Sequence, residues 1–178
     1  KVKEMNNYKL IYLPKVHCKI NDTVIIGVNG WWDYFNGNED AIKNTLSYFN
    51  KWMPDLCEIQ TLYFIVNTLT KAQENYKKLI KDIEFYQNDE SIKNIVIVSH
   101  TPPLKNNCNP LKIATEFNHN FETITNKKYN KVNTWIYGHI HEYRIQYFNN
   151  IKYICNPRGN PEDDYKDKKE FELEKLVL

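Results

Sequence analysis

The chain has 178 residues, a length that suits one ordinary domain and is short for two. Apolar residues make up 42% and charged residues 26%, so the composition excludes a disordered chain and allows a buried core. The 24 Lys and Arg and the 22 Asp and Glu leave a formal charge of +2, which argues against a dedicated nucleic-acid binder.

The first elements along the chain are two short apolar runs. Lys9–Leu13 and Thr23–Val28 lie on either side of the turn signal Asn21-Asp22, so they predict a pair of strands. The aromatic segment Trp31–Phe35 follows and is bounded by Asn and Gly, which favours a packed loop. Its two tryptophans could form an aromatic wall beside a substrate or part of the core.

Helical spacing of apolar residues predicts the next two elements. A first helix is expected over Asp40–Trp52. Thr70 and Gln73 stand three residues apart, as in a capping box, and predict the start of a second helix that ends near Asn88. The sequence leaves open whether Ile59–Leu69 is a separate helix or part of the second one.

The clearest strand is Ile95–Val98, a continuous β-branched run typical of a strand buried on both faces of a layered α/β sheet. The pair Pro102-Pro103 after it forces the chain out of regular structure. Apolar residues at helical spacing over Ile113–Ile124 predict another helix, with His119 off its apolar face and in solvent.

The last predicted elements are three strands. Thr134–Tyr137 is a short strand that ends at Gly138. Tyr143–Phe148 and Ile151–Cys155 flank the dipeptide Asn149-Asn150, and the pattern predicts a hairpin with a two-residue turn.

Two of the predicted strands end in histidines. His100 follows Ile95–Val98, while His139 and His141 follow Thr134–Tyr137. The carboxyl ends of adjacent strands in an α/β sheet meet at one edge, where ligands usually bind. Alternate side chains of an extended segment share a face, so His139 and His141 are expected to point the same way. Neutral imidazole is the commonest side-chain metal ligand, and the three histidines are therefore candidate metal ligands.

Segments at these strand ends resemble a known family. Val98–Pro103, Trp135–His141 and Cys155–Gly159 are together similar to the carboxyl-terminal half of the calcineurin-like metallophosphoesterases. Ile25–Phe35, a strand followed by a Trp-Asp loop, is similar to an element of the same subgroup. The resemblance implies that residues 1–178 are the carboxyl-terminal portion of a single layered αββα sandwich domain, with two sheets flanked by helices.

The resemblance also implies a function. In this family two divalent ions (Mn, Zn or Fe) bind a phosphoester and activate a bridging water. Carried over by motif, His100 and His139 bind one metal and His141 binds the other. Asn156 and Arg158 are implied to lie at the rim and to contact the phosphoester substrate. The implied protein is a metal-dependent phosphoester hydrolase.

The amino-terminal ligand motifs of the family are absent from this sequence, which contains no Asp-x-His, Gly-Asp-x-x-Asp or Gly-Asn-His. The nearest match, Gly37–Asp40, is expected instead to cap the helix that follows it. We therefore expect the missing amino-terminal half of the domain to complete the site. The alternative is a non-catalytic protein that keeps the fold as a binding or assembly module.

The remaining sequence features concern location. The longest apolar runs fall far short of the roughly 20 residues that span a membrane, so no membrane partner is expected. The four cysteines are scattered singly, with no C-x-x-C pair, and no apolar signal stretch opens the chain. These features favour a reducing compartment, and the expected location is cytoplasmic.

Overall fold

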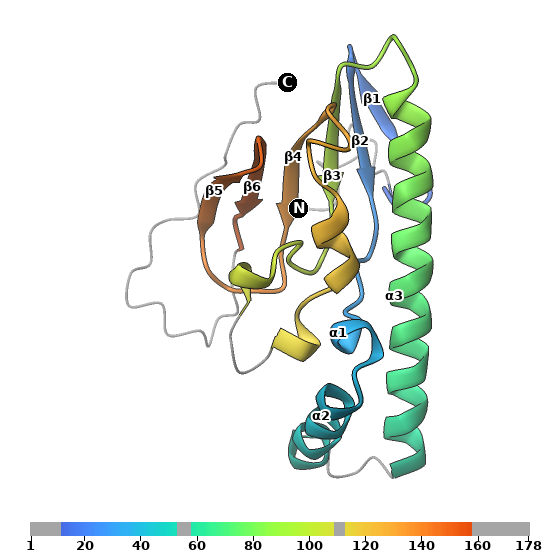
Figure 1. The fold of residues 1–178 in the computed structure, drawn as a ribbon, viewed down its shortest axis with the longest axis vertical. Helices are drawn as coiled ribbons and strands as arrows, with labels where there is room; N and C mark the ends of the chain where they lie inside the picture. Colours follow the sequence, from blue (N-terminus) through green and yellow to red (C-terminus); the bar gives the residue numbers. More distant parts are fainter. Residues whose placement is uncertain (1–11, 53–57, 109–112, 158–178) are drawn as a thin grey trace, which may run out of the picture.

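A six-stranded sheet runs through the residues that the computed structural model describes, which are 12–52, 58–108 and 113–157 (Figure 1). The strands are β1 (Cys18–Ile20), β2 (Thr23–Gly27), β3 (Asn94–Val98), β4 (Val132–Tyr137), β5 (Arg144–Phe148) and β6 (Ile151–Cys155). Their order in the sheet is β1-β2-β3-β4-β6-β5. The central strands β2, β3, β4 and β6 are parallel, and the two edge strands are antiparallel to their neighbours.

Helices accompany this sheet, so the predicted α/β class is confirmed. They are α1 (Tyr34–Gly37), α2 (Glu39–Trp52), α3 (Glu58–Gln87) and the short 3₁₀ helices η2 (Lys105–Asn107), η3 (Ile113–Thr115) and η4 (His119–Thr123). Figure 1 shows α3 running alongside the sheet and extending beyond it, with α2 beside the extending part. The second sheet of the implied sandwich is not seen within the described ranges.

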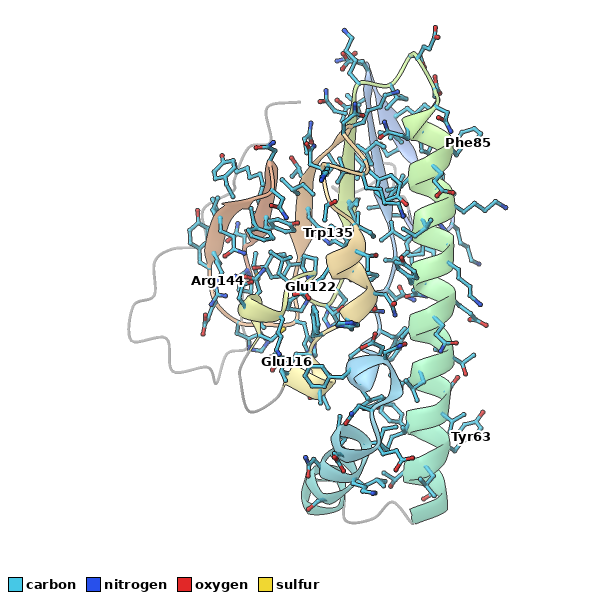
Figure 2. All side chains as sticks on the ribbon, in the orientation of Figure 1. Tyr63, Phe85, Glu116, Glu122, Trp135 and Arg144 are labelled. Carbon is cyan, nitrogen blue, oxygen red and sulfur yellow. The ribbon has the colours of Figure 1, made fainter. Side chains whose placement is uncertain are left out.

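The main core lies between the sheet and α3. Leu79 and Ile83 of α3 are buried in one cluster with Ile26 of β2, Ile97 of β3 and Trp135 of β4. Burying an aliphatic side chain of this size contributes about 1.5–3 kcal/mol, so this face of α3 fixes the helix to the sheet. The opposite face of α3 is in solvent, and Figure 2 shows its side chains projecting away from the sheet at two labelled positions, Tyr63 and Phe85.

The predicted first strand is wrong where the structure describes it. Leu13 lies in a turn, and the amino-terminal part of Lys9–Leu13 lies outside the described residues. The strand that pairs with β2 is Cys18–Ile20, because Asn21 adopts a left-handed conformation (φ 54°) and closes a tight turn between them. The turn predicted at Asn21-Asp22 is therefore confirmed, but the strand that precedes it is Cys18–Ile20 and not Lys9–Leu13.

The capping-box prediction at Thr70 is also wrong. Thr70 lies inside α3, and its hydroxyl donates to the Val66 carbonyl oxygen at 3.0 Å, one turn back in the same helix. The segment Ile59–Leu69 is therefore continuous with the helix that follows. The predicted helix over Asp40–Trp52 is confirmed as α2, and Asn38 caps it as expected, because its Oδ1 accepts from the Ala41 N–H at 3.0 Å.

The predicted helix over Ile113–Ile124 is replaced by two 3₁₀ turns, η3 and η4. Asn118 interrupts the helix, since its fully buried side chain donates to the Trp31 carbonyl oxygen and accepts from the Asn120 N–H. Phe117, Phe121 and Ile124 are nevertheless buried and Ile113 is half-buried, which explains the helical spacing of the sequence. His119 is exposed, as expected.

The remaining strand predictions are confirmed. β3 and β4 are parallel neighbours, and β5 and β6 form a hairpin through Asn149 and Asn150, whose φ values are 48° and 60°. Two left-handed residues are what a tight two-residue hairpin turn requires. The cysteines within the described ranges (Cys18, Cys108 and Cys155) are free. No helix in these ranges is both long enough and apolar enough to cross a membrane.

Candidate metal centre

The candidate site lies at the carboxyl edge of the parallel strands. Asn29 follows β2, His100 follows β3, His139 follows β4 and Asn156 follows β6, and these strands are successive neighbours in the sheet. Since the strands are parallel, all four residues lie at the same edge. The sheet topology therefore places the two predicted histidine segments next to each other.

His100 and His139 are in direct contact at this edge. The Nδ1 atom of His139 lies 3.0 Å from Nε2 of His100, and the two rings meet edge-to-face with centroids 4.9 Å apart. Backbone hydrogen bonds hold the two segments together, because the Gly138 N–H donates to the His100 carbonyl oxygen at 2.9 Å. The His100 N–H in turn donates to Asn29 after β2, so three strand ends are joined.

His139 occupies a tight turn and not the extended segment that the sequence argument assumed. Its φ is 67°, and the Ile140 N–H donates to the Gly138 carbonyl oxygen at 2.8 Å, which closes a three-residue turn centred on His139. A left-handed backbone is uncommon for a residue other than glycine. The inference that His139 and His141 share a face by strand alternation is therefore wrong.

The described residues do not assemble the predicted set of three histidines. Within residues 12–52, 58–108 and 113–157, no group of three or more His, Cys, Asp or Glu side chains is placed to hold a metal. His141 is exposed, whereas His139 is half-buried. Asn156 is half-buried at the same edge, and Arg158 lies outside the described residues.

The surroundings of His100 favour the form that binds metal. Partial burial of its ring lowers the pKa of the imidazole below the ordinary value of 6.5. The neutral ring therefore predominates at neutral pH, and the neutral ring has the lone pair that a metal needs. The pair could supply two nitrogen ligands to one divalent ion.

Sequence reasoning missed the residues that hold the loop after β2 against the site. Gly30 has a φ of 69°, its N–H donates to Asn75 Oδ1 on α3 at 2.8 Å, and its carbonyl oxygen accepts from the Thr101 hydroxyl. A glycine after a strand is a usable signal for such a close approach. Asn75 carries no signal, because it is a polar residue within a helix.

His17, which lies directly before β1, has a structural role. Its Nε2 atom lies 3.1 Å from Asp82 Oδ2, and its Nδ1 atom lies 2.9 Å from the Tyr86 hydroxyl. Both partners are on α3, so His17 fixes the segment before β1 to that helix.

No protein-family model matches the chain, and no curated protein matches it significantly. One solved structure with a similar fold is the phosphopantetheinyl hydrolase PptH from Mycobacterium tuberculosis, with a TM-score of 0.54 and 14% sequence identity. The match covers 82% of this chain and 54% of that one, so the chain spans about half the length of its structural neighbour. At this identity the likeness concerns the fold alone: this chain folds like part of that protein.

Proposed function

We propose that the chain is the carboxyl-terminal part of a metal-dependent phosphoesterase in which His100 and His139 bind one divalent ion. The 3.0 Å separation of their ring nitrogens carries this proposal. Two nitrogens that each lie about 2.0 Å from one tetrahedral ion are separated by about 3.3 Å, so a small adjustment of the rings would admit the ion. The sheet edge that carries the pair is where α/β proteins usually bind ligands.

The rest of the proposed site extends from this pair. His141 binds a second ion, and Asn156 and Arg158 contact the phosphoester substrate. Within the described residues no group of three or more His, Cys, Asp or Glu side chains is placed to hold a metal, so the proposal takes the further ligands from outside these residues, with an amino-terminal part of the domain as their expected source. The greater length of the similar structure is consistent with such a division.

The chemistry of the proposed site is ester hydrolysis. Bound Mn, Zn or Fe ions would lower the pKa of a bound water and neutralise negative charge on the phosphoryl oxygens. The residues of this chain hold two imidazoles at a fixed separation. The formal charge of the chain is only +2, so the metal would supply most of the positive charge that a phosphoester substrate needs.

Metal binding by the purified chain tests the pair directly. Calorimetric titration with ZnCl2 or MnCl2 should detect binding that weakens about tenfold or more in His100→Ala and in His139→Ala. His119→Ala is the matched control, because His119 is an exposed histidine away from the strand ends. Equal affinity in all four proteins would contradict the proposal.

Hydrolysis of p-nitrophenyl phosphate by the full-length protein, with Mn²⁺ or Zn²⁺ present, tests the activity. We expect turnover that His139→Ala abolishes and His119→Ala leaves unchanged. Unchanged turnover in His139→Ala would overturn the assignment of this residue to the active site.

A non-catalytic binding or assembly protein is the second candidate. It is favoured by the absence of a group of three metal-ligating side chains within the described ranges. The two candidates differ in the full-length protein, since only the enzyme hydrolyses the aryl phosphate in a metal-dependent manner.

A further inference from the structure

The indole of Trp32 lies against the imidazole of His139. The ring centroids are 5.8 Å apart and the planes are inclined by 31°, so the two rings are in tilted face contact. His100 meets the same imidazole at 75°, edge to face. His139 is therefore in contact with an indole and with a second imidazole at once.

The backbone on either side of Trp32 is fixed by hydrogen bonds. The side chain of Asn118 donates to the Trp31 carbonyl oxygen at 2.9 Å, and the Asp33 N–H donates to the Phe117 carbonyl oxygen at 3.4 Å. Asn118 and Asp33 are both buried. The residue between these two hydrogen bonds has little freedom to move, so its indole is a preorganised surface.

Helix α3 supports the indole from another direction. The Phe64 ring on α3 lies 6.4 Å from the Trp32 ring, and the Tyr34 ring lies 6.4 Å from it in an edge-to-face arrangement. The buried indole N–H lies beside the Tyr34 hydroxyl and makes no well-aligned hydrogen bond within the described part of the chain. The ring of Trp32, and not its N–H, is what contacts His139.

We propose that Trp32 is a positioning residue that fixes the plane of the His139 imidazole and keeps its Nδ1 atom beside His100. His139 is centred in a left-handed turn, where no regular strand pairing directs its side chain. Contact with a preorganised indole supplies that direction. The consequence for metal affinity rests on the proposed function, whereas the ring orientation does not.

Trp32→Leu removes the flat surface, and Trp32→Phe keeps one. Partners that orient a metal ligand typically change affinity by 10- to 100-fold, so we expect Zn²⁺ binding to weaken about tenfold in Trp32→Leu. Trp32→Phe should restore most of the affinity. Phe85→Leu is the control, because Phe85 is an exposed aromatic residue of α3 whose ring meets the Tyr86 ring, with centroids 4.9 Å apart.

The orientation itself is measured without metal, by NMR of the His139 ring protons assigned with His139→Gln. The indole ring current should shift these protons, and Trp32→Leu should move them toward ordinary positions while Phe85→Leu does not. His139 resonances in Trp32→Leu that stay where they are in the wild type, or an equal loss of Zn²⁺ affinity in Phe85→Leu, would overturn the positioning role. A wild-type chain that binds no Zn²⁺ would contradict the proposed metal centre, and the ring-current measurement would still decide the role of Trp32.

Discussion

The indole N–H of Trp135 donates to the Ser99 hydroxyl at 2.8 Å, and that hydroxyl donates to the Thr101 carbonyl oxygen at 2.8 Å. This pair connects the interior of β4 to the residue directly before His100. Trp135 is fully buried and Ser99 is 5% exposed, so water has no access to either group. The hydrogen bond therefore joins the packing of the core to the geometry of the candidate site.

Ser99→Ala is expected to destabilise the fold. It leaves a fully buried N–H without its partner, and such a loss costs about 1–3 kcal/mol of unfolding free energy. Urea unfolding followed by circular dichroism measures the difference. Ser47→Ala on the exposed face of α2 is the control and should change stability by less than about 0.5 kcal/mol. Equal stabilities of the two variants would show that the Ser99 hydroxyl is dispensable.

The two glycines nearest the histidines should respond differently to alanine. Gly30 has a φ of 69°, and a Cβ there would lie 3.1 Å from both Ser99 Cβ and Thr101 Oγ1. At Gly138 the nearest atoms would be the His100 carbonyl oxygen and Nδ1, at ordinary contact distances of 3.6 and 3.8 Å. Gly30→Ala should cost about 1–3 kcal/mol, and Gly138→Ala should cost clearly less. Thermal unfolding of both variants in parallel shows which substitution destabilises the fold more. A greater loss of stability in Gly138→Ala would contradict the prediction.

Elements whose local residue pattern has only one common structural outcome could be predicted from the sequence. Ile95–Val98 is a strand because an unbroken β-branched run has few other ways to bury itself, and Asn149-Asn150 tolerates the left-handed turn of a hairpin. The topology that brings His100 next to His139 follows from two such strands in parallel. This much of the candidate site could be predicted.

Other features depend on contacts between distant segments. Thr70 and Gln73 have the spacing of a helix start, but the Thr70 hydroxyl donates to the Val66 carbonyl oxygen within α3. Asn118 interrupts the predicted helix because it bonds the loop after β2, far away in the sequence. The turn at His139 and the contact of the Trp32 ring with its imidazole likewise form only after the strand ends meet, so no local pattern could reveal them.

Thiol labelling should separate the cysteines by burial. Burial raises the pKa of the Cys155 thiol to about 12, and the thiolate is the reactive form, so Cys155 should react slowly with iodoacetamide near about pH 8. Cys18 is half-buried on the edge strand β1 and should be labelled before Cys155. Mass spectrometry of digests taken over time gives the two rates. Equal rates in the native protein would contradict the burial of Cys155, and equal rates in denaturant are the expected control.

Asp33 should make stability depend on pH. Its carboxyl is 1% exposed, and burial raises its pKa above the ordinary value of 3.8, although backbone N–H groups, those of His119 and Asn36 first, oppose the shift. As pH rises above 3.8, the unfolded chain loses this proton before the folded chain does. The contribution of Asp33 to the unfolding free energy therefore falls as pH rises from 3.8 to the raised pKa of the folded chain. This contribution is highest below pH 3.8.

Asp33→Asn removes this titration. The unfolding free energy of the wild type should fall relative to that of Asp33→Asn as pH rises from about 3 to about 7. Urea unfolding at closely spaced pH values measures that difference. Glu74→Gln, which removes an exposed carboxyl from α3, is the control. A difference for Asp33→Asn that is constant with pH would show that the Asp33 carboxyl ionises alike in the folded and unfolded chains.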